Sequence, residues 1–218
     1  MKKRKILMVV TSHGRIDDSH ESGLWFEEFF APYKEFEAAG YEITIASPEG
    51  GVTPLDKKSL QTGSQMPKEA DLLQNTIQLS DINAAEYDAI FLTGGHGTMF
   101  DYPSSADLKI AVKTLARQNK PVASVCHGVA GLVGIQMDDG KPFVAEKHLT
   151  SFTNEEERMV KLENLVPFML ETRLKELGAI HKAGPSFTEH VIVDGNLITG
   201  QNPMSGKKTA QALIELLS

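Results

Sequence analysis

The sequence predicts an α/β fold in which a mostly parallel sheet is covered by helices on both faces. Short apolar runs, typical of buried parallel strands, alternate along the chain with amphipathic helical segments. Several of these runs end in glycine-rich or small-residue turns, as the loops of such folds do. The length of 218 residues fits one domain of ordinary size. We therefore expect residues 1–218 to form a single domain.

Short, strongly apolar runs mark the expected strands. They cover residues 5–10, 41–46, 88–93 and 121–125. Residues 143–153 are ambiguous and predict a strand plus a loop. Residues 191–199 predict a hairpin, because an Asp-Gly pair between apolar runs favours a tight turn.

The expected helices repeat apolar residues every three or four positions. They cover residues 23–39, 106–118 and 166–177. Gly40 and Gly178 follow the first and third of these, as glycine commonly does at helix ends. Ser205 is expected to cap a final helix that ends at Leu217.

Residues 47–87 fit the alternating pattern least well. The first part is rich in turn residues, and the second part contains only a weak helical segment. We expect a small insertion around 47–87 that covers the functional site or builds an interface between subunits.

Composition and charge exclude several classes of function. The net charge is −7, and no lysine- or arginine-rich block follows the basic first residues, so we expect no nucleic-acid partner. The apolar run at 6–10 is too short for a signal peptide or a membrane span, so we expect no membrane partner. A single cysteine excludes an internal disulfide framework, and this suits a cytoplasmic protein.

That single cysteine, Cys126, lies where a nucleophile is expected. It follows the apolar run 121–125, and Ser124 and Gly128 give it small neighbours on both sides. This pattern is typical of a nucleophile elbow, a sharp strand-to-helix turn that exposes the central side chain. A small-residue run, 128–134, predicts a closely packed helix, whose N-terminus would favour the thiolate. The alternative is a small buried hydrophobic residue, the commoner role of a lone cysteine.

Two neighbouring elements offer groups that would assist this cysteine. His127 is a candidate base, although adjacent helical residues ordinarily point about 100° apart. The turn Gly94-Gly95-His96-Gly97 follows a strand that ends at the same edge of the sheet. Gly95 would bring its N–H to a substrate oxyanion, opposite the N–H of His127. The alternatives are a phosphate cradle or simply a tight turn.

Candidate carboxylates lie in two places. Glu27 and Glu28 interrupt an apolar helix face, so one of them is expected to be withdrawn from water with a raised pKa. Both could instead be solvated, the commoner state of glutamate. The acidic run 154–157 predicts a helix start in which at least two of the three glutamates are solvated. One of them could orient His127.

The remaining histidines form no spacing typical of a metal site. We interpret them as structural or surface residues: His13, His20, His148, His181 and His190. The sequence therefore predicts neither a metal nor a cofactor.

Four segments resemble the ThiJ/PfpI superfamily, and within it the heat-shock chaperone branch known as glyoxalase III. They begin at Glu28, Gly94, Ala123 and Phe152, and the later run 194–203 is also similar. The resemblance covers nearly the whole chain. It implies the class I glutamine amidotransferase-like fold, a flavodoxin-like three-layer sandwich with a nucleophile elbow.

The resemblance also implies a role for each matching residue. Cys126 would be the nucleophile, His127 its partner and Glu157 the acid of the triad. Glu28 would be the buried glutamate that shuttles protons at the cysteine. Gly95 and His127 would supply the oxyanion N–H groups. His190 does not fit the His-x-Glu pair that true glutamine amidotransferases place late in the chain, so glutamine hydrolysis is not expected.

The implied function is a cofactor-free, cysteine-dependent hydro-lyase of the glyoxalase III or D-lactate dehydratase type. It would convert methylglyoxal, a small 2-oxoaldehyde, to lactate without glutathione through a hemithioacetal on Cys126. The alternatives are a redox sensor, holdase chaperone or protein deglycase of the same family, and a cysteine peptidase or amidase. Because the superfamily commonly dimerises, we expect a homodimer.

Overall fold

The computed structural model describes residues 3–60 and 66–218. Its central sheet has the strand order β3-β2-β1-β4-β5-β9-β8, in which every pairing is parallel except that of β8 with β9. The strands are β1 Lys5–Val9, β2 Glu42–Ser47, β3 Ile77–Gln78, β4 Ala89–Leu92, β5 Val122–Val125, β8 Val191–Asp194 and β9 Leu197–Gly200. The predicted mostly parallel sheet is confirmed.

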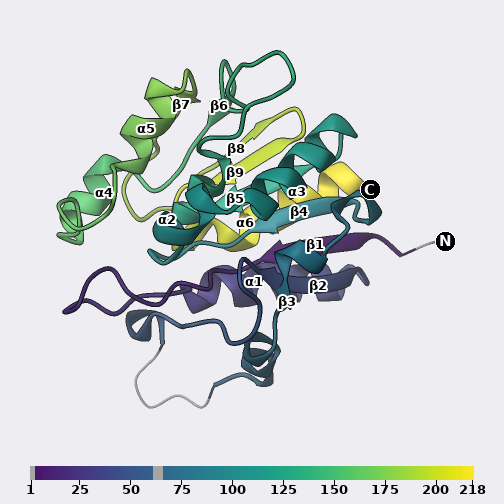
Figure 1. Cartoon of the computed structure of the whole chain (residues 1–218), viewed down its shortest axis with the longest axis horizontal. Coiled ribbons are helices and arrows are strands. Elements are labelled where there is room, and N and C mark those ends of the chain that lie inside the picture. The colour runs from purple at the N-terminus through teal and green to yellow at the C-terminus, as the bar shows by residue number, and fades with distance from the viewer. Residues whose placement is uncertain (1–2, 61–65) are drawn as a thin grey trace.

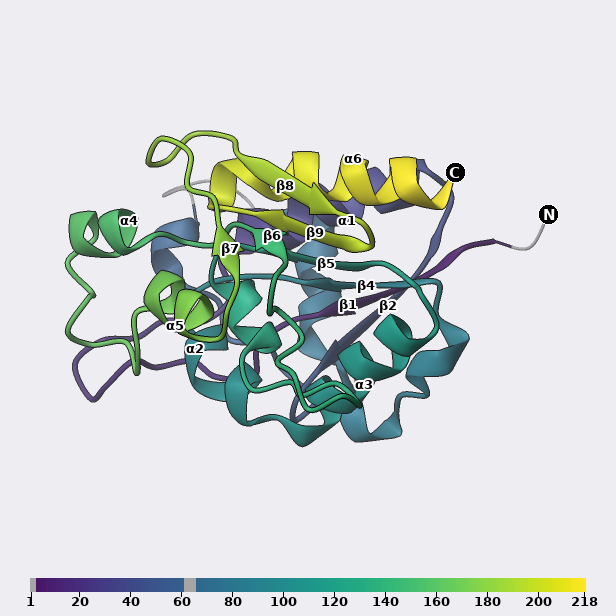
Figure 2. The same cartoon turned by 90° about the horizontal axis from the view of Figure 1, so that it is seen from above.

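Helices cover both faces of this sheet and enclose two apolar cores (Figure 2). On one face α1 (Phe26–Ala38) packs beside α6 (Gly206–Leu217), with Phe29 and Leu213 fully buried. On the other face lie α2 (Thr98–Asp101) and α3 (Ala106–Arg117). The amphipathic pattern of the predicted helices therefore reflects burial against a single sheet.

A smaller group of elements lies beyond the carboxyl ends of the strands, at the side opposite the chain termini (Figure 1). It contains α4 (Asn154–Met159), α5 (Leu170–Glu176) and a two-stranded parallel sheet of β6 (His148–Leu149) and β7 (Ile180–His181). The predicted strand within 143–153 is thus β6, whereas β7 was not predicted. Both strands have two residues, too few for a period-2 pattern.

Two predictions about helices are wrong. The run after Cys126 is a 3₁₀ helix, η6 (Cys126–Leu132), rather than an α-helix beginning at Gly128. Close packing explains this, since a Cβ on Gly128 would lie 2.3 Å from the Thr93 carbonyl oxygen. Ser205 occupies the N-cap position of α6, but its side chain makes no capping hydrogen bond, because its Oγ accepts the His190 N–H at 3.0 Å and lies 3.2 Å from Asn202 Oδ1.

The segment 47–87 is joined to the main sheet through β3, which pairs with β2. Its weak helical part consists of short 3₁₀ turns: η1 (Lys57–Ser59), η2 (Lys68–Gln74), η3 (Leu79–Asp81) and η4 (Ala84–Glu86). The carbonyl of Pro54 accepts the Leu24 N–H at 2.8 Å, so the segment supports the loop that leads into α1. Its residues 61–65 lie outside the described residues, and its expected part in an interface stays a prediction.

Among the residues that the structure describes, no helix is both long and apolar enough to cross a membrane.

Candidate active site

Cys126 occupies a strained turn directly after β5. Its φ is +58°, in the left-handed region that side chains other than glycine rarely adopt. The chain turns here because Gly128 comes so close to the end of β4 that no side chain would fit. The predicted elbow is confirmed, and the Cys126 residue is only 3% exposed. Sγ therefore lies at a nearly closed cavity rather than on the surface.

The strained turn also brings His127 to the sulfur. Sγ lies 3.4 Å from His127 Nδ1, and His127 Nε2 lies 2.6 Å from Glu157 Oε2. Adjacent residues of a regular helix would not converge in this way. Three residues that the sequence singled out separately thus form one hydrogen-bonded series of nucleophile, imidazole and carboxylate.

The electrostatics of this series fix the direction of each hydrogen bond. Burial opposes the ionisation of Glu157, but contact with His127 and His96 outweighs it and holds the pKa of this carboxyl well below its usual range. Burial, reinforced by His96, lowers the pKa of His127, so its ring is neutral at pH 7. Neutral His127 donates Nε2–H to the Glu157 carboxylate and presents the Nδ1 lone pair to the thiol.

The expected thiolate is not what the site favours at rest. Burial, together with the Glu28 carboxyl, raises the pKa of the Cys126 thiol. The backbone N–H of His127 lowers the pKa and partly offsets this rise. The helix that follows, η6, is a short 3₁₀ helix that begins at Cys126 itself, so the thiol does not face the N-terminus of a long α-helix. Cys126 is therefore a thiol at rest, and His127 Nδ1, 3.4 Å from Sγ, is placed to accept its proton.

Glu28 lies behind the sulfur, on α1. The prediction that one of two adjacent glutamates is buried is confirmed, because Glu28 is fully buried and Glu27 is exposed. Burial raises the pKa of Glu28 to about 8, an effect that the Cys126 thiol and the Gly94 N–H partly offset. Gly94 makes this placement possible, since a Cβ there would lie 2.1 Å from Glu28 Oε2. Glu28 thus carries a proton at pH 7.

The turn after β4 holds two further site residues. Gly95 has a φ of +104°, and a Cβ there would lie 2.3 Å from the Gly23 carbonyl oxygen, so the predicted tight turn is confirmed. The assignment of its N–H to an oxyanion stays a prediction. His96 lies 2.7 Å from Glu157 Oε1 through Nε2. The sequence interpretation assigned no role to His96, although its position at the carboxyl edge of the sheet, next to Gly95, was the available signal.

The acidic run at the start of α4 differs from its prediction. Only Glu155 is exposed, whereas Glu156 and Glu157 are both buried. Glu156 completes a capping box with Thr153 and also accepts the Phe187 N–H at 2.8 Å. The solvated interpretation of two glutamates is therefore wrong, because loops from other parts of the chain close over this helix and supply donors.

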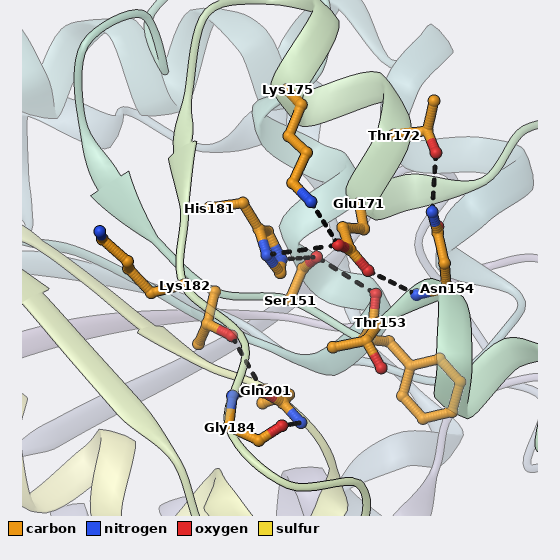
Figure 3. Close-up of polar contacts among 12 residues, drawn as sticks. Ser151, Thr153, Asn154, Glu171, Thr172, Lys175, His181, Lys182, Gly184 and Gln201 are labelled. Carbon is orange, nitrogen blue, oxygen red and sulfur yellow. Dashed lines mark hydrogen bonds and ion pairs between the residues drawn. The ribbon is translucent and has the colours of Figure 1, made fainter.

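A second polar cluster holds α4 from the side of α5 (Figure 3). Glu171 Oε2 accepts the Asn154 N–H at 2.7 Å, while Oε1 pairs with Lys175. The side chain of His181 is fully buried beside Glu171, and its Nε2 lies 3.0 Å from Ser151 Oγ. Because Glu157 belongs to α4, this cluster helps to fix the position of the carboxylate that His127 contacts.

The cavity above Cys126 is small and mostly apolar. Its volume is about 100 Å³, and it is lined by Trp25, Gly95, His96, Cys126, His127, Phe152, Val160, Phe187, Pro203 and Met204. The turn after β4 and the elbow after β5 contribute to it as predicted. Trp25, directly before α1, contributes a further part of the wall.

His96, His127 and Glu157 also meet the spacing of a metal site. Each offers one ligand atom, and these atoms lie within 4.8 Å of one another. Each histidine already hydrogen-bonds to one oxygen of Glu157, so the shared carboxylate is enough to explain why the three groups lie together. The prediction of a site without metal or cofactor stays a prediction.

Comparison with known proteins places this site in a family. The chain is 30% identical to Glyoxalase 3 of Candida albicans, over 96% of this chain and 97% of the relative. It is 30% identical to the glutathione-independent glyoxalase HSP31 of Saccharomyces cerevisiae, over 100% and 99%.

Two solved structures share the fold along the whole chain. The Rapid Encystment Protein REP24 of Francisella tularensis matches with a TM-score of 0.94 at 34% identity, covering 99% of both chains. Glyoxalase III of Candida albicans matches with a TM-score of 0.88 at 27% identity, covering 98% of this chain and 97% of the other. The model of the DJ-1/PfpI family matches residues 23–216. The resemblance found in the sequence is confirmed: the chain belongs to the DJ-1/PfpI family.

Proposed function

We propose that the protein is a glutathione-independent glyoxalase that converts methylglyoxal and water to lactate on Cys126. The observation that supports this most strongly is the series Cys126–His127–Glu157 at the floor of a small apolar cavity. The two fungal relatives that match over the full length carry glyoxalase names, which agrees with this assignment. A nucleophile, a neutral base and an ionised orienting carboxylate are the groups that covalent carbonyl chemistry needs.

The cavity indicates which aldehydes would enter. Among the described residues, no lysine or arginine lines it, and aromatic or aliphatic side chains form most of its wall. Such a wall offers no lysine or arginine side chain to pair with a phosphate or carboxylate on the substrate. We therefore propose small, uncharged 2-oxoaldehydes with an apolar substituent as the substrate class. The lactate anion, once formed, finds no cation there to hold it.

The first step forms the covalent adduct. As Sγ of Cys126 attacks the aldehyde carbon C1, His127 Nδ1 accepts the thiol proton and passes it to the former aldehyde oxygen. The N–H groups of Gly95 and His127 stabilise the oxyanion that forms in between. The product is a hemithioacetal, in which the S–C1 bond replaces the C=O π bond. Glu157 stabilises the transient imidazolium.

The second step moves a hydrogen from C1 to C2. Neutral His127 removes the C1 proton, and the electron pair passes through an enediolate to the ketone oxygen. His127 then returns the proton to C2, while the hydroxyl proton on the first oxygen moves to the second. The result is a lactoyl thioester of Cys126, with no external oxidant or reductant. Water hydrolyses this thioester, which releases lactate and restores the thiol.

Glu28 would serve the sulfur rather than the substrate. Its carboxyl lies against Cys126 but does not line the cavity. With a pKa of about 8, it can give a proton to the sulfur and recover it near neutral pH. We propose that it stabilises the sulfur anion that forms transiently, as Cys126 gives up its proton to attack and again as the thioester is hydrolysed.

Two other functions use the same residues. A redox sensor would oxidise Cys126 to a sulfinate, and the protonated carboxyl of Glu28 behind the sulfur is a suitable donor to it. Mass spectrometry after mild peroxide treatment tests for this modification. A peptidase or amidase is less compatible with the structure, because a cavity of about 100 Å³ does not hold an extended peptide. Deglycase and holdase activities, and the homodimer, stay predictions.

The direct test of the proposed function is lactate production from methylglyoxal by the purified protein in buffer without glutathione. Stereospecific lactate dehydrogenases identify the product, and the expected enantiomer is D-lactate. Phenylglyoxal is expected to be turned over, whereas a 2-oxoaldehyde that carries a phosphate is not. If methylglyoxal disappears without lactate, or not at all, the proposed function is wrong.

A further inference from the structure

The Glu157 carboxylate makes one more contact than a three-residue mechanism requires. Oε2 accepts His127 Nε2–H at 2.6 Å, and Oε1 contacts a second imidazole, that of His96, at 2.7 Å. The two rings are in contact at an interplanar angle of 41°, with centroids 3.9 Å apart. One carboxylate therefore bridges two imidazoles in a buried site.

The backbone holds His96 firmly in this position. Gly97 lies so close to the His13 carbonyl oxygen that a Cβ would come within 2.2 Å of it. The His96 carbonyl accepts the Met99 N–H at 3.1 Å as α2 begins. His96 is only 8% exposed, and the Phe152 ring packs edge-on to its imidazole. A buried ring fixed in this way limits the rotation of the carboxylate to which it donates.

We propose that His96 is a positioning residue that holds the Glu157 carboxylate in the orientation that His127 needs, so that the site is a Cys126–His127–Glu157–His96 tetrad. Because the carboxylate is ionised, it accepts from both rings, and each ring uses its Nε2 as a donor. The Nδ1 of His127 is thereby left as the acceptor for the thiol proton. Without His96, the carboxylate loses one of its two donors and is free to turn away.

His96 also limits how basic His127 becomes. The acidic groups that act on His127 are Glu157 and Glu156 from α4, and Glu28 from α1 acts on the neighbouring Cys126. A second donor on Glu157 weakens the pull of that carboxylate on the His127 proton, and His96 itself lowers the pKa of His127. Loss of the His96 donor is therefore expected to raise the pH at which His127 becomes neutral.

Two substitutions separate a donor role from a packing role. His96→Phe keeps an aromatic ring but removes the donor, whereas His96→Gln keeps a donor at a similar distance from the main chain. The expected loss in kcat/KM for methylglyoxal is roughly 10- to 100-fold in H96F, mainly in kcat, which corresponds to the loss of a hydrogen bond to a charged group. The acidic limb of the pH profile of kcat/KM should move to higher pH in H96F. The kcat/KM of H96Q should stay within about threefold of that of wild type.

Only the turnover prediction rests on the proposed function. A second measurement is independent of it. Cys126 is the sole cysteine, so iodoacetamide alkylation followed over pH reports this thiol alone. H96F is expected to slow alkylation at pH 7 and H96Q to restore it, while the exposed control His148→Gln changes nothing. Thermal melts establish that each variant is folded.

The outcomes are distinguishable. Slow alkylation in H96F with recovery in H96Q supports the tetrad even if wild-type protein makes no lactate, in which case only the proposed function fails. Unchanged alkylation in folded H96F overturns the proposal. Equal decreases in the alkylation rate in folded H96F and H96Q also overturn it, because a hydrogen-bond donor at this position would then not matter.

Discussion

Replacing Glu28 with glutamine should remove a strong pH dependence of stability and at the same time impair turnover. Glu28 is fully buried and keeps its proton up to a pKa of about 8, whereas the unfolded chain releases it near the ordinary glutamate pKa of 4.5. Between these values the folded state binds more protons than the unfolded state, so the free energy of unfolding falls as pH rises. At about 1.4 kcal/mol per pKa unit, this titration lowers the free energy of unfolding at pH 7 by roughly 3 kcal/mol relative to its value at low pH.

The measurement is urea unfolding of wild type and E28Q at pH 5 and pH 8. We expect the stability of E28Q relative to wild type to increase over this interval, because a neutral amide has no such titration. Glu27→Gln, on the exposed side of the same turn, is the matched control and should show a much smaller change. Parallel pH dependences in wild type and E28Q would mean that Glu28 is ionised in the folded protein.

Replacing Glu157 with glutamine should reduce kcat/KM for methylglyoxal by roughly 10²- to 10⁴-fold. Its carboxylate accepts from both His127 and His96, whereas a glutamine amide donates from one of its ends. If that end faces His127, Nε2 must become the acceptor and the ring proton moves to Nδ1. The ring then points a proton at the sulfur and is no longer able to accept one.

Two comparisons make this prediction specific. Glu155→Gln, two residues earlier and exposed, should stay within about threefold of wild type, a difference typical of a surface substitution. The alkylation defect of E157Q should shrink at alkaline pH, because hydroxide then removes the thiol proton without the help of His127. A defect of equal size at pH 7 and pH 9 would show that Glu157 acts only on the fold.

Much of this site was predictable because its parts are local. The elbow is encoded by an apolar strand followed by small residues around Cys126, and the position of Glu28 by a carboxylate within an apolar helix face. The glycine turn after β4 was predictable for the same reason. Because parallel strands end at one edge of a sheet, these local features imply that Gly95 and Cys126 meet.

What the sequence did not predict depends on contacts between distant residues. His96 and Glu157 are 61 positions apart, and their hydrogen bond exists only because α4 is folded back over the carboxyl ends of the strands. The burial of Glu156 has the same origin, since its donors come from Phe187, Gln201 and Asn202. The resting thiol at Cys126 follows from complete enclosure, which no local pattern around a cysteine reveals.

The central claim is that Cys126 carries the substrate, and lactate release by wild type and Cys126→Ser, measured side by side without glutathione, tests it most directly. The serine hydroxyl has nearly the same shape but is a far weaker nucleophile at neutral pH. We predict lactate in proportion to the methylglyoxal consumed by wild type and a rate at least about 10³-fold lower in the folded serine variant. Lactate release by C126S at the wild-type rate would contradict a covalent mechanism.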